Sequence, residues 1–209
     1  MKKLVLSALA VFSLTFVNAQ EEEKFYGFEE GDVFIEGTIG FSASKDNNAN
    51  VKANSFQFNP KGGYFLSDEL AVGLEFGYLS SKQDQKIDNV YQTVDKSSAF
   101  EVGAFARYYF LELGKRFKTY GEFNLGFGSV KEGLAPAERK ASFFGTGVSL
   151  GLNYFVTERI AISFGLSDIL SYTSGKPEGG ERVSEFKFGI NEFNNFFDSN
   201  ATFGLIYKL

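Results

Sequence analysis

The sequence predicts an all-β protein, an eight-stranded antiparallel up-and-down transmembrane β-barrel, on three observations. Apolar and polar residues alternate with a period of two in eight segments of the 209-residue chain, the pattern of strands that have one apolar face. Aromatic residues make up 17% of the chain, and 23 residues are glycine, a composition of strand formers and small residues. The connections between the segments alternate between short and long, an asymmetry typical of barrels that span a membrane.

The first 19 residues have the three parts of a secretory signal peptide. Lys2 and Lys3 give a positive start, residues 4–17 form an apolar run, and Val17-Asn18-Ala19 places small residues before a cleavage point. We expect residues 1–19 to be removed, which lowers the formal net charge from −5 to −7 because two of the 21 basic residues are lost against 26 acidic ones. A chain this acidic has no electrostatic footprint for nucleic acid.

The next segment, residues 20–30, predicts a solvated, loose acidic arm. Its charge comes from Glu21, Glu22, Glu23, Glu29 and Glu30, with Asp32 just beyond. Residues 31–209 then form the barrel domain, because period-two alternation returns throughout and no amphipathic helix is evident.

Each of the eight predicted strands has an apolar side chain at every second position. In chain order they span residues 33–42, 56–64, 70–79, 98–110, 117–129, 142–155, 160–171 and 199–209. Their apolar faces include, one residue per strand in the same order, Ile39, Phe58, Leu74, Val102, Leu125, Leu150, Ile162 and Leu205.

The lengths of the connections predict which end of the barrel each one occupies. Residues 66–70, 112–116 and 156–159 are short turns, whereas 44–54, 80–97, 130–140 and 173–199 are long and polar. In a meander every second connection lies at the same end, so we expect four long external loops opposite three short periplasmic turns. In the last loop Phe186, Phe188 and Ile190 alternate, which predicts that strands seven and eight extend beyond the bilayer.

The contrast between the two strand faces predicts that the apolar faces point outward and contact lipid. The apolar faces carry no Asp, Glu, Lys or Arg, and the opposite faces combine glycine with few charges. A water-facing surface would carry about 25–35% charged residues, so these polar faces fit a narrow lumen instead. Aromatic residues at both ends of the apolar faces suit the two bilayer interfaces. They are Tyr64, Tyr108, Phe110, Phe117, Tyr154 and Tyr207 at one rim, and Phe41, Phe56, Tyr78, Phe100, Phe127 and Phe144 at the other.

The last residues, Thr202-Phe203-Gly204-Leu205-Ile206-Tyr207-Lys208-Leu209, resemble the C-terminal signal by which outer-membrane barrels are recognised for insertion. Phe203, Leu205, Tyr207 and Leu209 carry its alternating positions, with Leu209 in place of the usual terminal Phe. Together with strand-turn-strand phrases such as Phe65–Gly73 and Asn153–Ala161, the chain resembles the small OmpA-, OmpX- and OmpW-like outer-membrane β-barrel family. That resemblance implies a Gram-negative outer membrane, insertion by the barrel-assembly machinery, and contact with outer-membrane lipid and lipopolysaccharide.

The missing residue types exclude most catalytic chemistry. The chain has no His and no Cys, which removes Ser-His and Cys-His nucleophiles and the commonest metal ligands. We therefore expect no enzymatic activity, and we identify no catalytic, metal or cofactor site. The notable polar set is a predicted network of lumen charges, in which an arginine holds carboxylates. Its members are Glu36, Lys61, Glu75, Glu101, Arg107 and Glu122.

These observations predict a monomeric barrel with a packed lumen and a structural or surface-interaction role. Its external loops would contact an extracellular ligand through Asp46, Lys82, Asp84, Lys86, Asp88, Lys131, Glu138 and Arg139. Two alternatives remain open. One is a small porin-like conduit for ions or hydrophobic solutes, and the other is a soluble periplasmic or secreted barrel that binds a hydrophobic ligand.

Overall fold

The computed structural model describes residues 24–189 and 203–209, and these residues form nine β-strands. The strands are β1 (Val33–Asp46), β2 (Val51–Phe65), β3 (Leu70–Ile87), β4 (Val90–Leu113), β5 (Phe117–Glu132), β6 (Arg139–Phe155), β7 (Ile160–Pro177), β8 (Val183–Phe188) and β9 (Phe203–Lys208). None of the described residues forms a helix with the length and hydropathy needed to cross a membrane. The predicted signal peptide, residues 1–19, lies outside the described residues.

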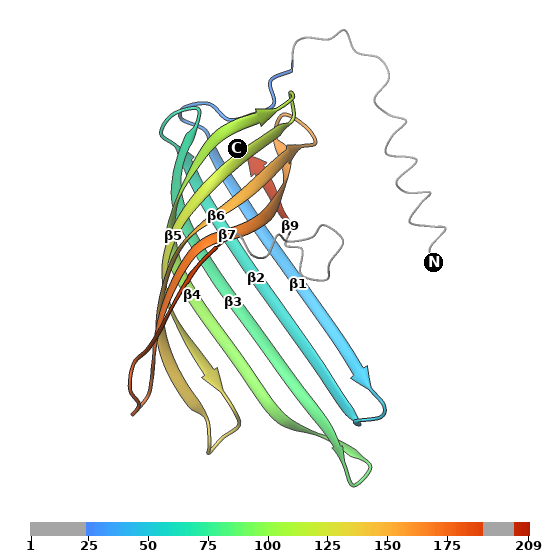
Figure 1. Cartoon of the computed structure of the whole chain (residues 1–209). Coiled ribbons are helices and arrows are strands. Elements are labelled where there is room, and N and C mark those ends of the chain that lie inside the picture. The colour runs from blue at the N-terminus through green and yellow to red at the C-terminus, as the bar shows by residue number, and fades with distance from the viewer. Residues whose placement is uncertain (1–23, 190–202) are drawn as a thin grey trace, which may run out of the picture.

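Eight of the strands form a closed antiparallel ring, which confirms the predicted fold. β1 to β7 pair in sequence order, and β9 closes the ring by pairing with both β1 and β7. The three short turns lie together at one end, with β9 beside them, and the other hairpins lie at the opposite end (Figure 1). Because the ring is closed where β9 joins β1, no strand edge there is left without a hydrogen-bonded partner strand.

Strands extend into three of the four predicted long loops and make up most of 44–54 and 80–97, so that part of the prediction is wrong. The hairpin turns lie at residues 47–50, 88–89 and 133–138, and β3 and β4 pair as far as Ile87 and Val90. The reason is physical: where water reaches both faces of a ribbon, the polarity contrast disappears although backbone pairing continues. Period-two alternation therefore underestimates the length of strands that leave the membrane.

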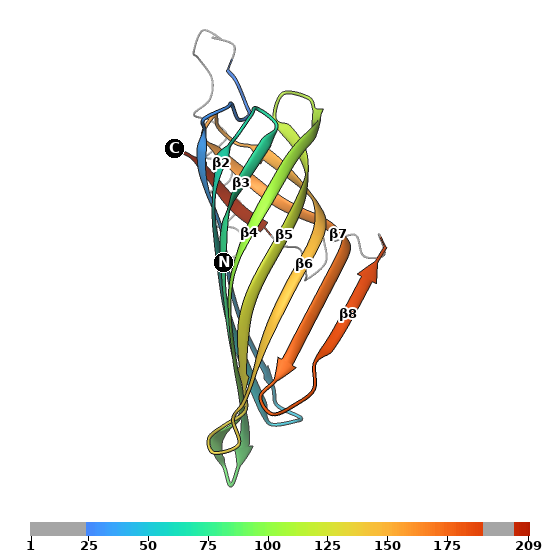
Figure 2. The ribbon, with the colours of Figure 1, turned by 90° about the vertical axis from the view of Figure 1, so that its left-hand side faces the viewer.

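The fourth long connection contains β8, as the alternation of Phe186 and Phe188 predicts. β8 pairs with the outer part of β7, from Leu170↔Phe188 to Gly175↔Val183, while β9 pairs with the first residues of β7. Figure 2 shows β8 continuing the wall beside β7. Ile190, the third residue of that pattern, lies outside the described residues.

Burial separates the two faces as predicted, with apolar side chains outside and the charged groups inside. Ile39 and Leu74 on the outer face are 74% and 70% exposed, whereas Arg107 in the lumen is 1% exposed. An apolar surface of this kind around the whole barrel requires a non-aqueous surrounding.

The end of the lumen near the short turns is filled by aromatic rings, which the glycine-rich pattern does not predict. The buried apolar cluster consists of Phe28, Phe34, Phe65, Ala71, Phe105, Tyr109, Tyr120, Phe155, Ala161 and Ile206. Phe28 belongs to the segment predicted to be a loose arm, but it is only 4% exposed and stacks on Phe65 with ring centroids 4.3 Å apart. Glu29 and Glu30 beside it are exposed. The arm therefore contributes the buried ring of Phe28 to the core, and the partly buried Tyr26 packs against the same cluster.

Glycines in the lumen stand directly opposite these rings. Gly63 is the cross-strand partner of Phe34, Gly73 of Phe105, and Gly151 of Tyr120. A Cβ atom built on any of the three would collide with the ring of its partner. The glycines therefore provide the space into which the rings fold.

Gly63 and its neighbour Gly62 offer a direct test of this packing. Gly63→Ala should destabilise the barrel by about 1–3 kcal/mol, because it overpacks a filled site against Phe34. Gly62→Ala is the control, since a Cβ there meets open space. Urea unfolding in detergent micelles measures both, and equal stabilities would contradict the packing assignment.

The extended β3–β4 hairpin is held by polar contacts on its outer face. Lys82 Nζ lies 3.0 Å from Asp84 Oδ1, and Thr93 Oγ1 donates a hydrogen bond of 2.9 Å to the same oxygen. The contacts from Lys82 and Thr93 hold the pKa of Asp84 below its ordinary value.

This pKa predicts the behaviour of the hairpin in acid. The contacts of Asp84 require the carboxylate, so they are present at neutral pH and are lost as the pH falls through the lowered pKa. An NMR titration of the Asp84 carboxyl carbon should give a midpoint below the usual value of about 3.9. Thr93→Val should raise that midpoint, and an unchanged midpoint would contradict the hydrogen bond.

Candidate functional site

The charged residues of the lumen are brought to one level by strand register. Glu36 on β1 is the cross-strand partner of Lys61 on β2, and Lys61 is also the partner of Glu75 on β3. On the next two strands of the ring, Arg107 on β4 is paired with Glu122 on β5. Opposite charges that face each other on adjacent strands stabilise the pairing, so the register itself assembles the charge layer.

Arg107 connects the two sides of the barrel. Its Nη2 atom lies 2.7 Å from Glu36 Oε2 and 2.5 Å from Glu122 Oε2, and its Nε donates a 2.7 Å hydrogen bond to Glu122 Oε2. The guanidinium carbon lies 4.1 Å from the centre of the Tyr120 ring, a cation–π contact. A fully buried guanidinium is stable only when it is paired in this way.

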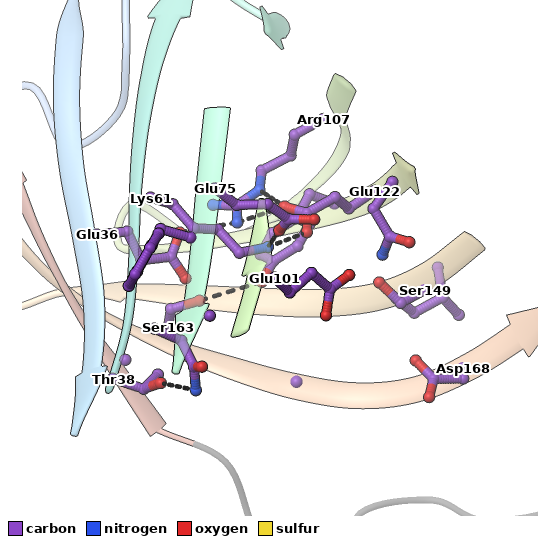
Figure 3. A pocket seen from close by; sticks show the side chains of 18 residues that line it. Glu36, Thr38, Lys61, Glu75, Glu101, Arg107, Glu122, Ser149, Ser163 and Asp168 are labelled. Atoms are coloured by element: carbon purple, nitrogen blue, oxygen red, sulfur yellow. Dashed lines mark hydrogen bonds and ion pairs between the residues drawn. The ribbon is translucent and has the colours of Figure 1, made fainter. Parts of the chain in front are cut away.

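Lys61, on β2, completes the charge layer. Its Nζ lies 2.5 Å from Glu122 Oε1 and 2.9 Å from Glu75 Oε2. Glu122 thus receives both cations, one on each carboxylate oxygen. Figure 3 shows these side chains converging from separate strands across the lumen.

Glu101, the sixth residue of the predicted network, is not joined to the other five by an ion pair among the described residues. Its carboxylate lies over Gly126, where a Cβ would collide with it. It lines the same cavity of about 440 Å³ as the charge layer, together with Asn59, Asn124 and Asp168. This cavity contains more carboxylates than cations (Figure 3).

A second set of polar contacts joins the charge layer to the aromatic cluster. Asn153 Nδ2 donates a 2.7 Å hydrogen bond to the hydroxyl of Tyr109, which also accepts a 3.4 Å bond from Arg107 Nη1. Tyr120 Oη lies 3.1 Å from Ser163 Oγ. Sequence reasoning did not identify these residues, although the adjacent apolar pairs Tyr108-Tyr109 and Tyr154-Phe155 are a signal that both strand faces are filled there.

The N-terminal segment is fastened across the end of this cluster near the short turns. Arg116 Nη2 donates a 2.8 Å hydrogen bond to Tyr26 Oη, and Lys208 Nζ donates a 3.2 Å bond to the carbonyl oxygen of Gly27. The amide of Gly31 bonds to the carbonyl oxygen of Phe65 at 3.0 Å. Phe28 is therefore held between the short turns of the barrel.

The residues of the predicted insertion signal alternate along the outer face of β9. Phe203, Leu205, Tyr207 and Leu209 are all exposed, and Ile206 between them is buried in the lumen. Within residues 24–189 and 203–209, no three acidic side chains are arranged to hold a metal ion.

The comparison that identifies the fold covers most of the sequence. A family model described as "Outer membrane protein beta-barrel domain" matches residues 6–207. The chain belongs to that family. The closed ring with apolar side chains outside and charged groups inside is the architecture expected of such a barrel. Among curated protein sequences, none matches the chain.

Several solved outer-membrane proteins are similar in structure at low sequence identity. OprG from Pseudomonas aeruginosa has a TM-score of 0.49 and 16% identity, over 88% of this chain and 99% of that one. The N-terminal β-barrel domain of Pseudomonas aeruginosa OprF has a TM-score of 0.47 and 15% identity, over 87% and 100%. Neisserial surface protein A has a TM-score of 0.46 and 18% identity, over 85% and 96%.

The charge layer predicts a specific pattern of stability. Arg107→Met should destabilise the barrel by about 3–5 kcal/mol, because it leaves Glu36 and Glu122 buried without their cation. Adding Glu36→Gln should restore part of the loss, since Lys61 still compensates Glu122. Urea unfolding measures both variants.

The matched control is Arg159→Met, which removes an exposed cation from a short turn. It should leave stability nearly unchanged. If Arg107→Met and Arg159→Met unfolded at the same urea concentration, Arg107 would not be an essential member of the layer.

Proposed function

We propose that this protein is a monomeric outer-membrane barrel with a sealed lumen. It acts structurally or by surface contacts through its outer hairpins, which are the hairpins β1–β2, β3–β4, β5–β6 and β7–β8 at the end opposite the short turns. The observation that carries this proposal is the Arg107 layer, which crosses the lumen from β4 to β1 with ion-pair distances of 2.5–2.7 Å. Export by the segment 1–19 and insertion through the C-terminal signal belong to the same proposal.

Two successive layers support the sealed lumen. The ion pairs of Arg107 and Lys61 cross the lumen, and the rings around Phe28 fill its end near the short turns. Free diffusion of a solute would have to break ion pairs between buried groups and displace packed rings, and both steps are costly.

The outer hairpins support a role in surface contact. Paired strands continue to Ile87 and Val90 in the β3–β4 hairpin, well past Tyr78 of the predicted aromatic rim. A paired hairpin presents its side chains in fixed positions, which lowers the entropic cost of binding a partner. The binding surface would include the charged residues near the tips, among them Asp46, Asp84 and Asp88.

One observation favours the conduit alternative. The 440 Å³ cavity is lined by carboxylates, including Glu75, Glu101 and Asp168, and rings of acidic side chains favour cations in channels. For this alternative to hold, the Arg107 layer would have to open. The soluble alternative conflicts with membership of an outer-membrane family.

Planar-bilayer recordings of the purified protein test the sealed lumen. The wild-type barrel should give no large, steady, open conductance. Combining Arg107→Met and Glu36→Gln with Phe28→Ala should produce conductance, because this variant removes a part of both layers. A variant that disrupts only one of the two layers should conduct less than the combined variant, since the other layer remains.

Steady open conductance of the wild-type protein would contradict the proposal and favour the conduit. The combined variant could also give no conductance while its heat-modifiable gel migration shows that it is folded. That result would show that other groups close the lumen.

A further inference from the structure

The segment that precedes β1 contacts parts of the barrel that are far apart in the sequence. Residues 24–32, which we call the strap, run across the barrel end where the short turns lie (Figure 1). The amide of Glu30 donates a 2.9 Å hydrogen bond to Asp68 Oδ1 in the β2–β3 turn. Asp32 Oδ2 lies 3.2 Å from Lys208 Nζ on β9. The strap thus connects an early turn of the barrel with its last strand.

Arg116 joins the strap to the other two short turns. From the β4–β5 turn, its Nη2 atom donates the 2.8 Å hydrogen bond to Tyr26 Oη, and its Nη1 atom donates a 3.2 Å bond to the carbonyl oxygen of Val156 in the β6–β7 turn. The guanidinium carbon also lies 4.4 Å from the centre of the Tyr26 ring, a cation–π contact. The strap is therefore linked to all three short turns.

Lys208 joins the strap to the seam between the first and last strands. In the described residues, β9 pairs with β1 only from Phe34↔Lys208 to Gly37↔Leu205, whereas β2 pairs with the whole length of β1. The side chain of Lys208 extends from this short seam and donates its 3.2 Å hydrogen bond to the carbonyl oxygen of Gly27. The strap therefore adds contacts where the described ring has the fewest strand pairs.

The surface that receives Phe28 is built from four strands. The ring of Phe28 stacks on Phe65 of β2, and its centroid lies 5.7 Å from that of Phe34 on β1. The corresponding distances are 5.5 Å to Tyr109 on β4 and 5.2 Å to Phe155 on β6. These four rings stand together only when the strands that carry them are paired in a ring. Phe28 therefore has no site to occupy before the barrel has formed.

The strap is held by separate contacts and not by strand pairing. Residues 24–32 take no part in the β1–β2 and β1–β9 ladders, which begin at Val33 and Phe34. A cavity of about 350 Å³ also remains between Phe25 and Phe28 of the strap and the end of β4 around Leu111. The strap can therefore leave the barrel without breaking any pair between strands.

The separations along the chain predict when the strap docks. Gly27 and Lys208 are 181 residues apart, and Tyr26 and Arg116 are 90 apart. Contacts between such distant residues form late, because the entropic cost of closing the loop between them comes first. Contacts that form after the rate-limiting step of folding slow unfolding and leave the folding rate unchanged.

We propose that the strap is a clasp that docks after the ring has closed, and that its release precedes unfolding of the barrel. The clasp thereby makes the closed ring kinetically stable. This inference depends on the closed ring, and it is independent of the sealed lumen and of the surface role.

The test variant combines Tyr26→Phe with Lys208→Met, which removes two groups that fasten the strap to the turns and to β9. Phe28 is unchanged, so the aromatic cluster keeps its ring. The full-length barrel in neutral detergent micelles should unfold in urea at least about tenfold faster than wild type, because hydrogen bonds to charged groups are among the stronger ones. Its refolding rate should change less than about twofold. Heat-modifiable gel migration measures both rates.

The control is Lys115→Met, which removes an exposed cation next to Arg116 and should leave both rates unchanged. If the double variant does not fold, Tyr26→Phe alone provides the test. It removes only the hydroxyl that Arg116 contacts, and it should raise the unfolding rate by a smaller factor.

Hydrogen exchange of the wild-type barrel tests whether the strap opens by itself. The amide of Gly31 bonds to the carbonyl oxygen of Phe65 at 3.0 Å, so it exchanges when the strap is released. It should exchange faster than the amides in the middle of β5. Its exchange should also respond little to urea, because a local opening exposes little surface.

Three results would overturn the proposal. They are equal unfolding rates of the test variant and the wild type, a refolding rate lowered as much as the unfolding rate is raised, and exchange of the Gly31 amide only on global unfolding. The second result would place the strap contacts in the closing step itself. A wild-type barrel that conducts ions would contradict the sealed lumen and would not change the rates expected here.

Discussion

The structure depends on the need to compensate one buried cation. Arg107 lies inside a ring of eight strands with almost no access to water, and a guanidinium in such a place must have carboxylates within ion-pair distance. Glu122 comes from the adjacent strand and Glu36 from the far side of the ring. This requirement matches the register of β4 against β5 and links β4 to β1 across the lumen.

The rest of the lumen follows from its limited volume. Eight strands enclose only enough space for packed side chains, so a large ring on one strand requires glycine opposite it, as Phe34 requires Gly63. Phe28, from the segment that precedes β1, fills the end of the lumen near the short turns. The aromatic and ionic layers thus fill the narrow interior near the short turns, and the ionic layer also aligns the strands that contribute to it.

Much of the fold could be predicted because lipid imposes a strong constraint on every second residue. Ile39, Leu74 and Leu125 face outward as the alternation indicates, and five of the six predicted lumen charges meet in the lumen. The hairpin lengths could not be predicted, since outside the membrane both faces of β3 and β4 contact water and the alternation is lost. The inward position of Phe28 could not be predicted either, because it depends on a space that exists only after the ring has closed.

The lysine pairs near the hairpin ends opposite the short turns illustrate the same limit. In the sequence, Lys45 and Lys52, or Lys82 and Lys96, are ordinary polar residues of apparent loops, and the spacing within the pairs differs. Only the observed register places them opposite each other and on the face of Phe41 and Phe100. The hydrocarbon constrains the residues of the outer wall within it, and the register reveals the basic rows that follow them. A strand that leaves a bilayer therefore carries its sequence constraint beyond the apolar region, as a bias in charge that becomes visible once the pairing is known.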